Sequence, residues 1–322
     1  MSVLTLATMP RGLTPQADEH LAGKMPSHGT ETCAVVEAIV SLAASGGILG
    51  DAALFERAER VTYNAMPAAT TKDTWARVYL QQSNEIWAVH EDPSVFATDG
   101  ADSAMFGLET NYGCCTANMH AGWPKFTAMA LGSSADGSVG VLMWAPVQAT
   151  FASGTVSVVT DYPFGDSATV TVTPTGTAPL PVFLRIPSWA TGATLAVNGG
   201  SPMPLGPLVA GTFYRTETVG AAGTATTYVV NFAPAILMEE FTPGGAVTIV
   251  RGALVYSVWL GENFTVTSTH PFESRDYAIH ATSSWNVALV LDRANPGASL
   301  TFKQLAKPRW VSIGCVAYTQ SW

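Results

Sequence analysis

The chain has 322 residues, of which 48% are hydrophobic types and only 12% are charged, and its net charge is −9. At roughly 150 residues per domain this length predicts about two domains, and the apolar content allows an ordered core. An acidic chain with no basic run is repelled by phosphate backbones, so we predict no nucleic-acid binding. The best membrane-helix candidate, Ala34–Leu49, is interrupted by Glu37 and ends in Gly46-Gly47. It is shorter than the roughly 18–20 residues of a membrane helix, so we also predict no membrane span.

Signals for a cellular compartment are weak. Met1–Pro10 has no basic residue before its short apolar run, so no signal peptide is visible. The chain has 4 cysteines, too few for a disulfide scaffold. One sequon, Asn263-Phe264-Thr265, permits glycosylation only in a secretory compartment. Localisation therefore stays open.

The residues from about Thr30 to Leu131 are predicted to be helical. A first helix has apolar residues at helical spacing from Val35 to Leu42 and a stop at Gly46-Gly47. Asp51 is predicted to cap a second helix that ends near Pro67. The pattern over 75–90 fits strand or helix equally. A third helix is predicted over 115–131, with a kink or a second start at its proline, residue 124.

Beyond about Gly137 the apolar residues follow a period of two in short pieces. Gly, Pro, Asn and Asp separate these pieces, which is typical of an antiparallel sandwich or barrel, and Asn198-Gly199 predicts a hairpin turn. The predicted strands cover 155–159, 168–172, 182–186, 228–232, 246–250, 255–260, 287–291 and 299–302. We therefore predict an α+β multidomain chain with a helical domain over 1–135 and a β-sandwich region over 136–322.

Two short segments carry residues suited to chemistry. Thr30-Glu31-Thr32-Cys33 and Asn111-Tyr112-Gly113-Cys114-Cys115 together offer three thiols and a carboxylate. Zinc accepts this ligand set in tetrahedral geometry. The spacing matches no zinc-finger pattern, however, and the alternative is that Cys33, Cys114 and Cys115 are buried, metal-free apolar residues.

Seven short motifs, in order and spacing over about Asp18 to Tyr256, resemble the β-L-arabinofuranosidase family, glycoside hydrolase family 127. The most diagnostic are the Glu-Thr-Cys and Cys-Cys elements. The matching residues are Glu31–Ala34, Glu59 with Tyr63-Asn64, Tyr79–Gln82, Gly113–Asn118, Leu184–Trp189, Val197–Gly199 and Arg251–Tyr256.

The resemblance implies the C-terminal part of an (α/α)6 barrel followed by antiparallel β-sandwich domains. It also implies a retaining exo-glycosidase that acts on a carbohydrate substrate, an arabinofuranosyl or related glycoside. By position, the family's zinc ion (Zn2+) would be held by Glu31, Cys33, Cys114 and Cys115. The first residue of the adjacent cysteine pair, Cys114, would be the nucleophile.

The remaining roles follow from position in the same resemblance. Glu19 matches the family's acid/base, with Asp18 as the fallback, and both could instead lie in a solvated turn. Glu59 and Tyr79 match residues that contact the sugar; otherwise Glu59 would be an exposed helix charge and Tyr79 a core aromatic.

Several further residues have simpler interpretations. The side chains of Trp87 and Trp123 could stack on a sugar, but core packing is the simpler prediction for both. His90 and His120 are expected to be structural, and Cys315 to be a lone strand thiol.

The chain departs from the family at its start. Family members carry several hundred residues before the Glu-Thr-Cys element, whereas here only 30 residues precede Glu31. We therefore expect a truncated chain with an open half-barrel, through which it could self-associate, and doubtful activity in this short form. Two alternatives to the enzyme stay open: a non-catalytic carbohydrate-binding or structural zinc protein, and a metal-free helical-plus-β protein.

Overall fold

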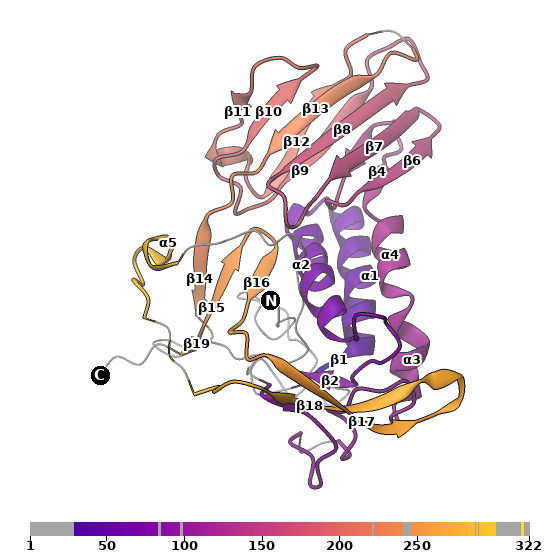
Figure 1. The fold of residues 1–322 in the computed structure, drawn as a ribbon. Coiled ribbons are helices and arrows are strands. Elements are labelled where there is room, and N and C mark those ends of the chain that lie inside the picture. The colour runs from indigo at the N-terminus through magenta and orange to yellow at the C-terminus, as the bar shows by residue number, and fades with distance from the viewer. Residues whose placement is uncertain are drawn as a thin grey trace. The chain divides into compact units, whose positions relative to one another are not determined.

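The protein mixes helices with several mostly antiparallel sheets (Figure 1). The computed structural model describes residues 29–82, 85–96, 99–220, 222–240, 246–286, 288, 290–300 and 317–318. Within them the chain forms two compact units that interleave along the sequence. Of the described residues, one unit comprises those up to Ala38, those within Arg60–Gly122 and those from Ile236 onward, and the other comprises those within Ile39–Glu59 and Trp123–Ala235. The predicted domain boundary at 135/136 stays a prediction.

The first helix, α1 (Thr32–Leu49), is longer than predicted. It passes through Gly46-Gly47 and ends where Gly50 takes a φ of 66°. Two helical glycines cost only about 1 kcal/mol each, and at Gly46 the ring of Phe55 fills the space that a side chain would need. By length and composition alone α1 could cross a membrane, which corrects the expectation that no stretch is long enough. Val35, Val36 and Ile39 are fully buried, as in a core helix.

The second helix, α2 (Ala52–Ala68), follows the predicted pattern. Asp51 caps it, because its Oδ1 accepts a hydrogen bond from the Ala53 amide at 2.9 Å. Pro67 lies in its last turn. The predicted third helix is two helices, α3 (Gly113–Met119) and α4 (Gly122–Ala128), and Pro124 lies in the first turn of α4.

In the described part of the unit that contains residues 60–122, the strands form three small sheets. The first pairs β1 (Thr30–Glu31) with β2 (Leu80–Gln81). The second has the order β14 (Ile236–Glu240), β15 (Ala246–Arg251) and β16 (Leu254–Tyr256), with β19 (Ala317–Tyr318) also paired to β15. The third has the order β17 (Glu262–Thr269), β18 (Arg275–Ala281) and β3 (Trp87–Ala88). A 3-10 turn, η3 (Pro271–Glu273), connects β17 to β18.

Asn64 joins α2 to the β15–β16 turn in this unit. Its amide donates to the carbonyl of Ala253 at 2.8 Å and accepts from the amide of Val255 at 2.9 Å, and the side chain is fully buried. Near the C-terminus the predicted strand over 299–302 is wrong at its first residue, because α5 (Pro296–Ser299) is helical after a proline at its first position.

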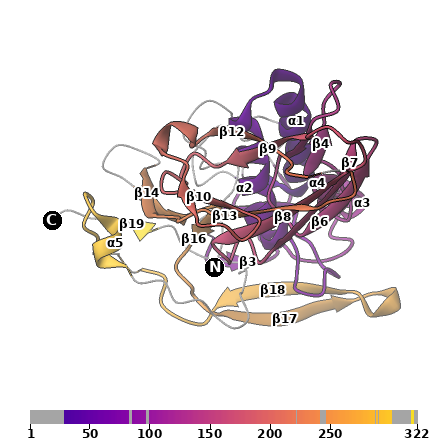
Figure 2. The ribbon, with the colours of Figure 1, turned by 90° about the horizontal axis from the view of Figure 1, so that it is seen from above.

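The other unit is a β-sandwich, and Figure 2 shows its two sheets as layers. The six-stranded sheet runs in the order β11 (Met203–Pro204), β10 (Thr194–Val197), β13 (Thr226–Asn231), β8 (Ser167–Pro174), β7 (Gly154–Thr160) and β6 (Val147–Phe151). The four-stranded sheet runs in the order β12 (Thr212–Glu217), β9 (Pro181–Ile186), β5 (Val139–Val141) and β4 (Leu131–Ser133). A 3-10 turn, η2 (Pro207–Val209), precedes β12.

Alternating valines form the sandwich core. On β8, Val170 and Val172 are fully buried while their neighbours are partly exposed, as the period of two predicts. The hairpin at Asn198-Gly199 is confirmed, with φ of 49° and 72° at the two residues. One pair, β5 with β9, is parallel rather than antiparallel. Between β5 and β9 the chain passes through β6, β7 and β8 of the other sheet, and it therefore runs along β9 in the same direction as along β5.

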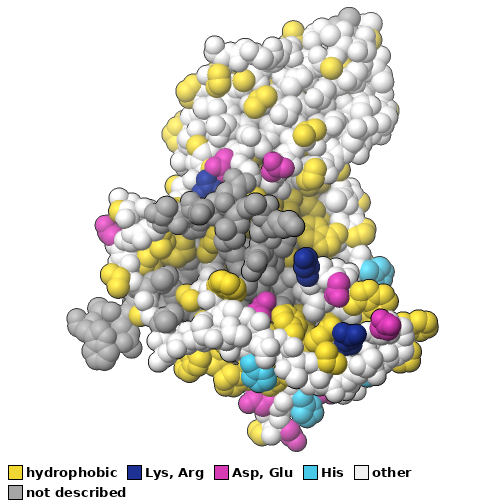
Figure 3. Space-filling model, viewed as in Figure 1, with side chains coloured by type: hydrophobic (Ala, Val, Ile, Leu, Met, Phe, Trp, Pro, Cys, Tyr) yellow, Lys and Arg dark blue, Asp and Glu magenta, His cyan; other side chains and the backbone are white. Residues whose placement is uncertain are grey.

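Charged side chains are sparse on the face seen in Figure 3, and hydrophobic ones lie at the surface around the β17–β18 hairpin. On β17, Phe264 and Val266 are 41% and 45% exposed. The low charge content of the sequence is thus visible on this face.

Candidate metal centre

Backbone pairing fixes the Glu-Thr-Cys element. β1 pairs with β2 so that Glu31 lies opposite Leu80, and the Thr32 amide donates to the carbonyl of Tyr79 at 3.0 Å. The Thr32 hydroxyl donates to the carbonyl of Val78 at 2.7 Å. Because α1 begins at Thr32, the next side chain, Cys33, projects from the first turn of the helix.

The Cys-Cys element begins α3. Tyr112 immediately precedes this helix, and its ring stacks on that of Tyr79 with centroids 3.8 Å apart and planes 7° from parallel. Cys115 is fully buried in a small apolar cluster that also contains Tyr79 and Leu80. The stack and the cluster hold the cysteine pair, Cys114 and Cys115, against β2, the strand that pairs with the Glu31 strand.

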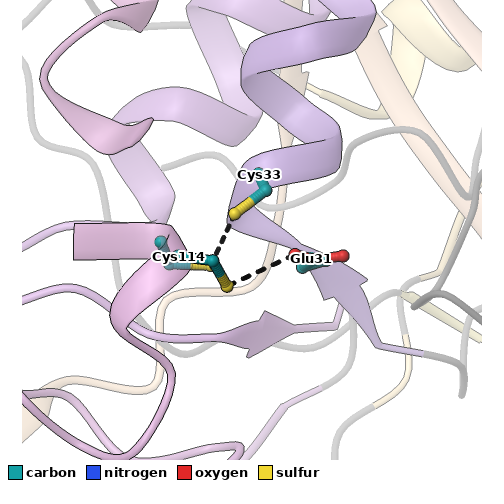
Figure 4. Close-up of side chains that lie close together, drawn as sticks. Glu31, Cys33 and Cys114 are labelled. Carbon is teal, nitrogen blue, oxygen red and sulfur yellow. Dashed lines mark hydrogen bonds between the residues drawn. The ribbon is translucent and has the colours of Figure 1, made fainter. Parts of the chain in front are cut away.

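The four predicted ligands converge. One ligand atom from each of Glu31, Cys33, Cys114 and Cys115 lies within 4.8 Å of all the others. The Sγ atoms of Cys33 and Cys115 are 3.3 Å apart, and the Sγ of Cys114 lies 3.9 Å from Glu31 Oε1 and 4.0 Å from the Sγ of Cys115. Figure 4 shows Glu31 from β1, Cys33 from α1 and Cys114 from α3 pointing toward one another.

The arrangement fits a zinc ion. Sulfur ligands at about 2.3 Å from tetrahedral zinc are roughly 3.8 Å apart, close to the separations observed between these atoms. Outside the four, Asn118 donates its side-chain amide to the Sγ of Cys33 at 3.4 Å. Such a bond orients a ligand from its outer side. Among the described residues, no other His, Cys, Asp and Glu side chains gather in this way.

The protein environment of Cys33 and of Cys114 raises the pKa of each thiol, which favours its protonated form. A hydrogen bond with Cys115 and burial raise the pKa of Cys33. Burial and the neighbouring Cys33 raise the pKa of Cys114. Metal binding here must therefore release protons. The four ligands also differ in exposure: Glu31 and Cys115 are buried, whereas Cys114 is exposed.

Comparisons with known proteins point to one family. Residues 138–215, within the sandwich, match the family model described as "Beta-L-arabinofuranosidase, GH127 middle domain". The resemblance to glycoside hydrolase family 127 is confirmed. A comparison with curated protein sequences finds no match.

Solved structures show the same fold. The chain is similar to a protein titled "Glycoside hydrolase", with a TM-score of 0.60 and 17% identity, covering 78% of this chain and 49% of the other. It is similar to the GH127 β-L-arabinofuranosidase Ara127N of Geobacillus stearothermophilus T6, with a TM-score of 0.58 and 15% identity over 79% and 47% of the two chains. A further GH127 β-arabinofuranosidase has a TM-score of 0.56 and 16% identity over 78% and 46%. The chain thus spans about half the length of each of these three solved structures.

Glu59, which the GH127 resemblance assigns to the sugar, is buried in the sandwich unit. Its carboxylate accepts hydrogen bonds from the Trp144 amide at 2.6 Å, from the Tyr162 hydroxyl, and from Arg185, and the side chain is 0% exposed. Burial raises the pKa of Glu59, and the charge of Arg185 opposes the rise. This is not the exposed helix charge of the alternative interpretation. A sugar contact by Glu59 stays a prediction, and in this structure its oxygens are enclosed by protein.

The other residues assigned through GH127 have mixed placements. Tyr79 is 5% exposed and stacked on Tyr112, and its contact with a sugar stays a prediction. Glu19, Asp18 and Cys315 lie outside the described residues.

The two tryptophans expected in the core are each 40% exposed, so that expectation is wrong. Trp87 donates its indole N–H to Glu91, and Trp123 lies edge-on to the ring of Phe126. The sequence around an isolated tryptophan in a short apolar run does not show whether its side chain faces the core or the solvent. His90 is exposed and pairs with Asp102 at 2.5 Å, while His120 is exposed at the end of α3.

Two residues near the ligands were not singled out from the sequence. Asn118 follows Cys114 by four residues on α3, so helical periodicity alone places them on one face. Arg77 is the single charge in the apolar run Trp75–Leu80, and the structure buries it fully. A lone arginine in such a run is a signal for a buried polar network.

Proposed function

We propose that the chain is the zinc-binding part of a retaining exo-glycosidase of the β-L-arabinofuranosidase type, with Cys114 as its nucleophile. We also propose that its helices belong to an (α/α)6 barrel. One observation carries the proposal: the Glu31, Cys33, Cys114 and Cys115 ligand atoms converge, and Cys114 is the exposed one of the three thiols. The match of residues 138–215 to GH127 supports it.

Three ligands would hold the site and the fourth would react. Glu31, Cys33 and Cys115 are fixed by the β1–β2 pairing, the first turn of α1 and the apolar cluster. Bound zinc would supply charge that keeps the cysteine sulfurs deprotonated. The sulfur of Cys114, facing solvent, can then attack the anomeric carbon, forming a carbon–sulfur bond as the glycosidic oxygen leaves.

An acid/base completes the reaction. Glu19 would give its proton to the leaving oxygen and then take one from the water that releases the sugar from Cys114, regenerating the thiolate. The substrate would be a non-reducing β-L-arabinofuranosyl or related residue, with Tyr79 and Glu59 as its proposed contacts.

Hydrolysis of a chromogenic β-L-arabinofuranoside, measured together with zinc content, tests the proposal. We expect about one zinc per chain, lost in Cys33→Ala, and turnover abolished in Cys114→Ser and in Glu19→Gln. Asp18→Asn is the matched control for Glu19 and should keep turnover. Turnover that survives Cys114→Ser would overturn the nucleophile assignment. One zinc per chain without any turnover would favour a structural zinc site, because structural sites also have four protein ligands.

A further inference from the structure

Arg77 is among the largest fully buried side chains of the protein, and no described residue gives it a close carboxylate partner. A guanidinium placed in the interior is costly unless its donors are satisfied. Here the acceptors are all neutral, namely two hydroxyls and two carbonyls. A buried arginine with such partners holds the chain around it through hydrogen bonds, which a hydrophobic residue could not form.

The acceptors of Arg77 lie on both sides of the cysteine pair. Its Nη1 donates to the Thr110 hydroxyl at 2.8 Å, and its Nη2 donates to the Tyr112 carbonyl at 2.7 Å and to the Leu108 carbonyl at 3.4 Å. Its Nε donates to the Thr116 hydroxyl at 3.1 Å. The planar fork of one side chain thus spans the chain before and after Cys114 and Cys115.

Main-chain bonds fix where the fork sits. The amide of Arg77 donates to the carbonyl of Gly107 at 3.1 Å, and the amide of Gly107 donates back at 3.0 Å. Along the chain, Arg77 lies between Thr71–Trp75 and β2. The strand β2 pairs with β1, which carries Glu31. One residue therefore connects the strand side of the cluster with the loop that carries the cysteine pair.

The charge of Arg77 also suits the cluster. Burial lowers the pKa of Arg77, and the groups that oppose this are first the thiols of Cys115 and Cys114, followed by Glu109 and Cys33. Four anionic ligands around a divalent cation leave two negative charges in excess. A buried cation beyond the ligands offsets part of that excess.

We propose that Arg77 is a positioning residue that holds Cys114 and Cys115 in register with Cys33 and Glu31 through its hydrogen bonds to residues 108–116. The proposal rests on the zinc site of the proposed function. It assigns Arg77 no contact with substrate and no proton transfer.

Cobalt substitution of the full chain tests the positioning, because thiolate ligands give cobalt(II) a sulfur charge-transfer band. Cys33 is the one of the three thiols that lies outside the segment bonded to Arg77, so in Arg77→Met we expect the band to fall toward one third and cobalt affinity to fall roughly 10- to 100-fold. Arg77→Lys keeps the charge but not the fork, and should fail to restore the band. The control Arg60→Met removes another arginine of the same unit, which pairs with Glu239 at 2.7 Å, and should leave the band unchanged. A full band in Arg77→Met, or its recovery in Arg77→Lys, would overturn the proposal.

A metal-free measurement separates this proposal from the proposed function. Cys115 is 0% exposed, so iodoacetamide should alkylate it slowly in the wild type, as followed by mass spectrometry. We expect Arg77→Met to raise that rate about tenfold or more by loosening the loop, and the milder Thr110→Val to raise it by a smaller factor. Arg60→Met should not raise it. Unchanged protection of Cys115 in Arg77→Met would refute the role of Arg77. A wild-type protein that binds no cobalt would refute the zinc site alone.

Discussion

Replacing Glu59 by Gln should strongly destabilise the sandwich unit. Both Glu59 and Arg185 are 0% exposed and form an ion pair at 2.5 Å. A glutamine can still accept from the Trp144 amide, but it removes the counter-ion nearest to the buried guanidinium of Arg185. Breaking one side of a buried pair costs about 3–5 kcal/mol. At about 2–4 °C per kcal/mol, the melting temperature should fall by roughly 6–20 °C.

Thermal unfolding followed by circular dichroism measures this loss, with Glu56→Gln as the matched control. Glu56 lies one turn earlier on α2, its side chain is 22% exposed, and it is 3.9 Å from Arg185. Glu56 also accepts hydrogen bonds from the Ser188 amide and hydroxyl at 2.6 Å, and a glutamine can still accept one of them, so Glu56→Gln should cost only about 1–2 kcal/mol. Equal melting temperatures for the two variants would refute the buried-pair reasoning. A raised KM with unchanged stability in Glu59→Gln would instead support a sugar contact.

Three further perturbations test separate parts of the account. Gly107→Ala should lower the free energy of unfolding in urea by about 1–3 kcal/mol, because the added Cβ would overlap the carboxylate of Asp276. The control Gly47→Ala adds a Cβ that meets no atom within 4 Å, so it should be neutral or stabilising. Burial raises the pKa of Glu85 well above its usual value. This carboxyl therefore stabilises the fold at low pH, and that contribution is lost as pH rises through the folded-state pKa. Glu85→Gln should remove this fall of stability with pH from unfolding midpoints measured between pH 4 and pH 8. Because the pKa of Cys114 is raised, zinc affinity measured by competition with a chelator should increase with pH; a pH-independent affinity would show that the thiols do not ionise on binding.

The sequence predicts local structure well where one signal dominates. The cap at Asp51, the turn at Asn198-Gly199 and the alternating valines of β8 each depend on neighbours only a few residues away. The sequence places the end of α1 too early, because the reason for a glycine at position 46, the Phe55 ring that occupies the space of a side chain there, is known only from the fold. The parallel β5–β9 pair likewise depends on which sheet each strand joins.

The candidate metal centre shows the same division. Residue types alone suggested zinc, and the family resemblance chose the four ligands. That Glu31 and Cys114, 83 residues apart, approach to 3.9 Å depends on the β1–β2 pairing and on the loop before α3. Short-range patterns do not contain such pairings, and for the same reason Arg77 did not stand out as a partner of that loop.

Zinc K-edge X-ray absorption of the purified full chain tests the central claim most directly. The account predicts about one zinc per chain with three sulfur neighbours at about 2.3 Å and one oxygen at about 2.0–2.2 Å. It also predicts two sulfur neighbours in Cys33→Ala if that variant retains any zinc. A zinc shell made only of nitrogen and oxygen, or protein that takes up no zinc while folded, would contradict the assignment of Glu31, Cys33, Cys114 and Cys115 as one metal centre.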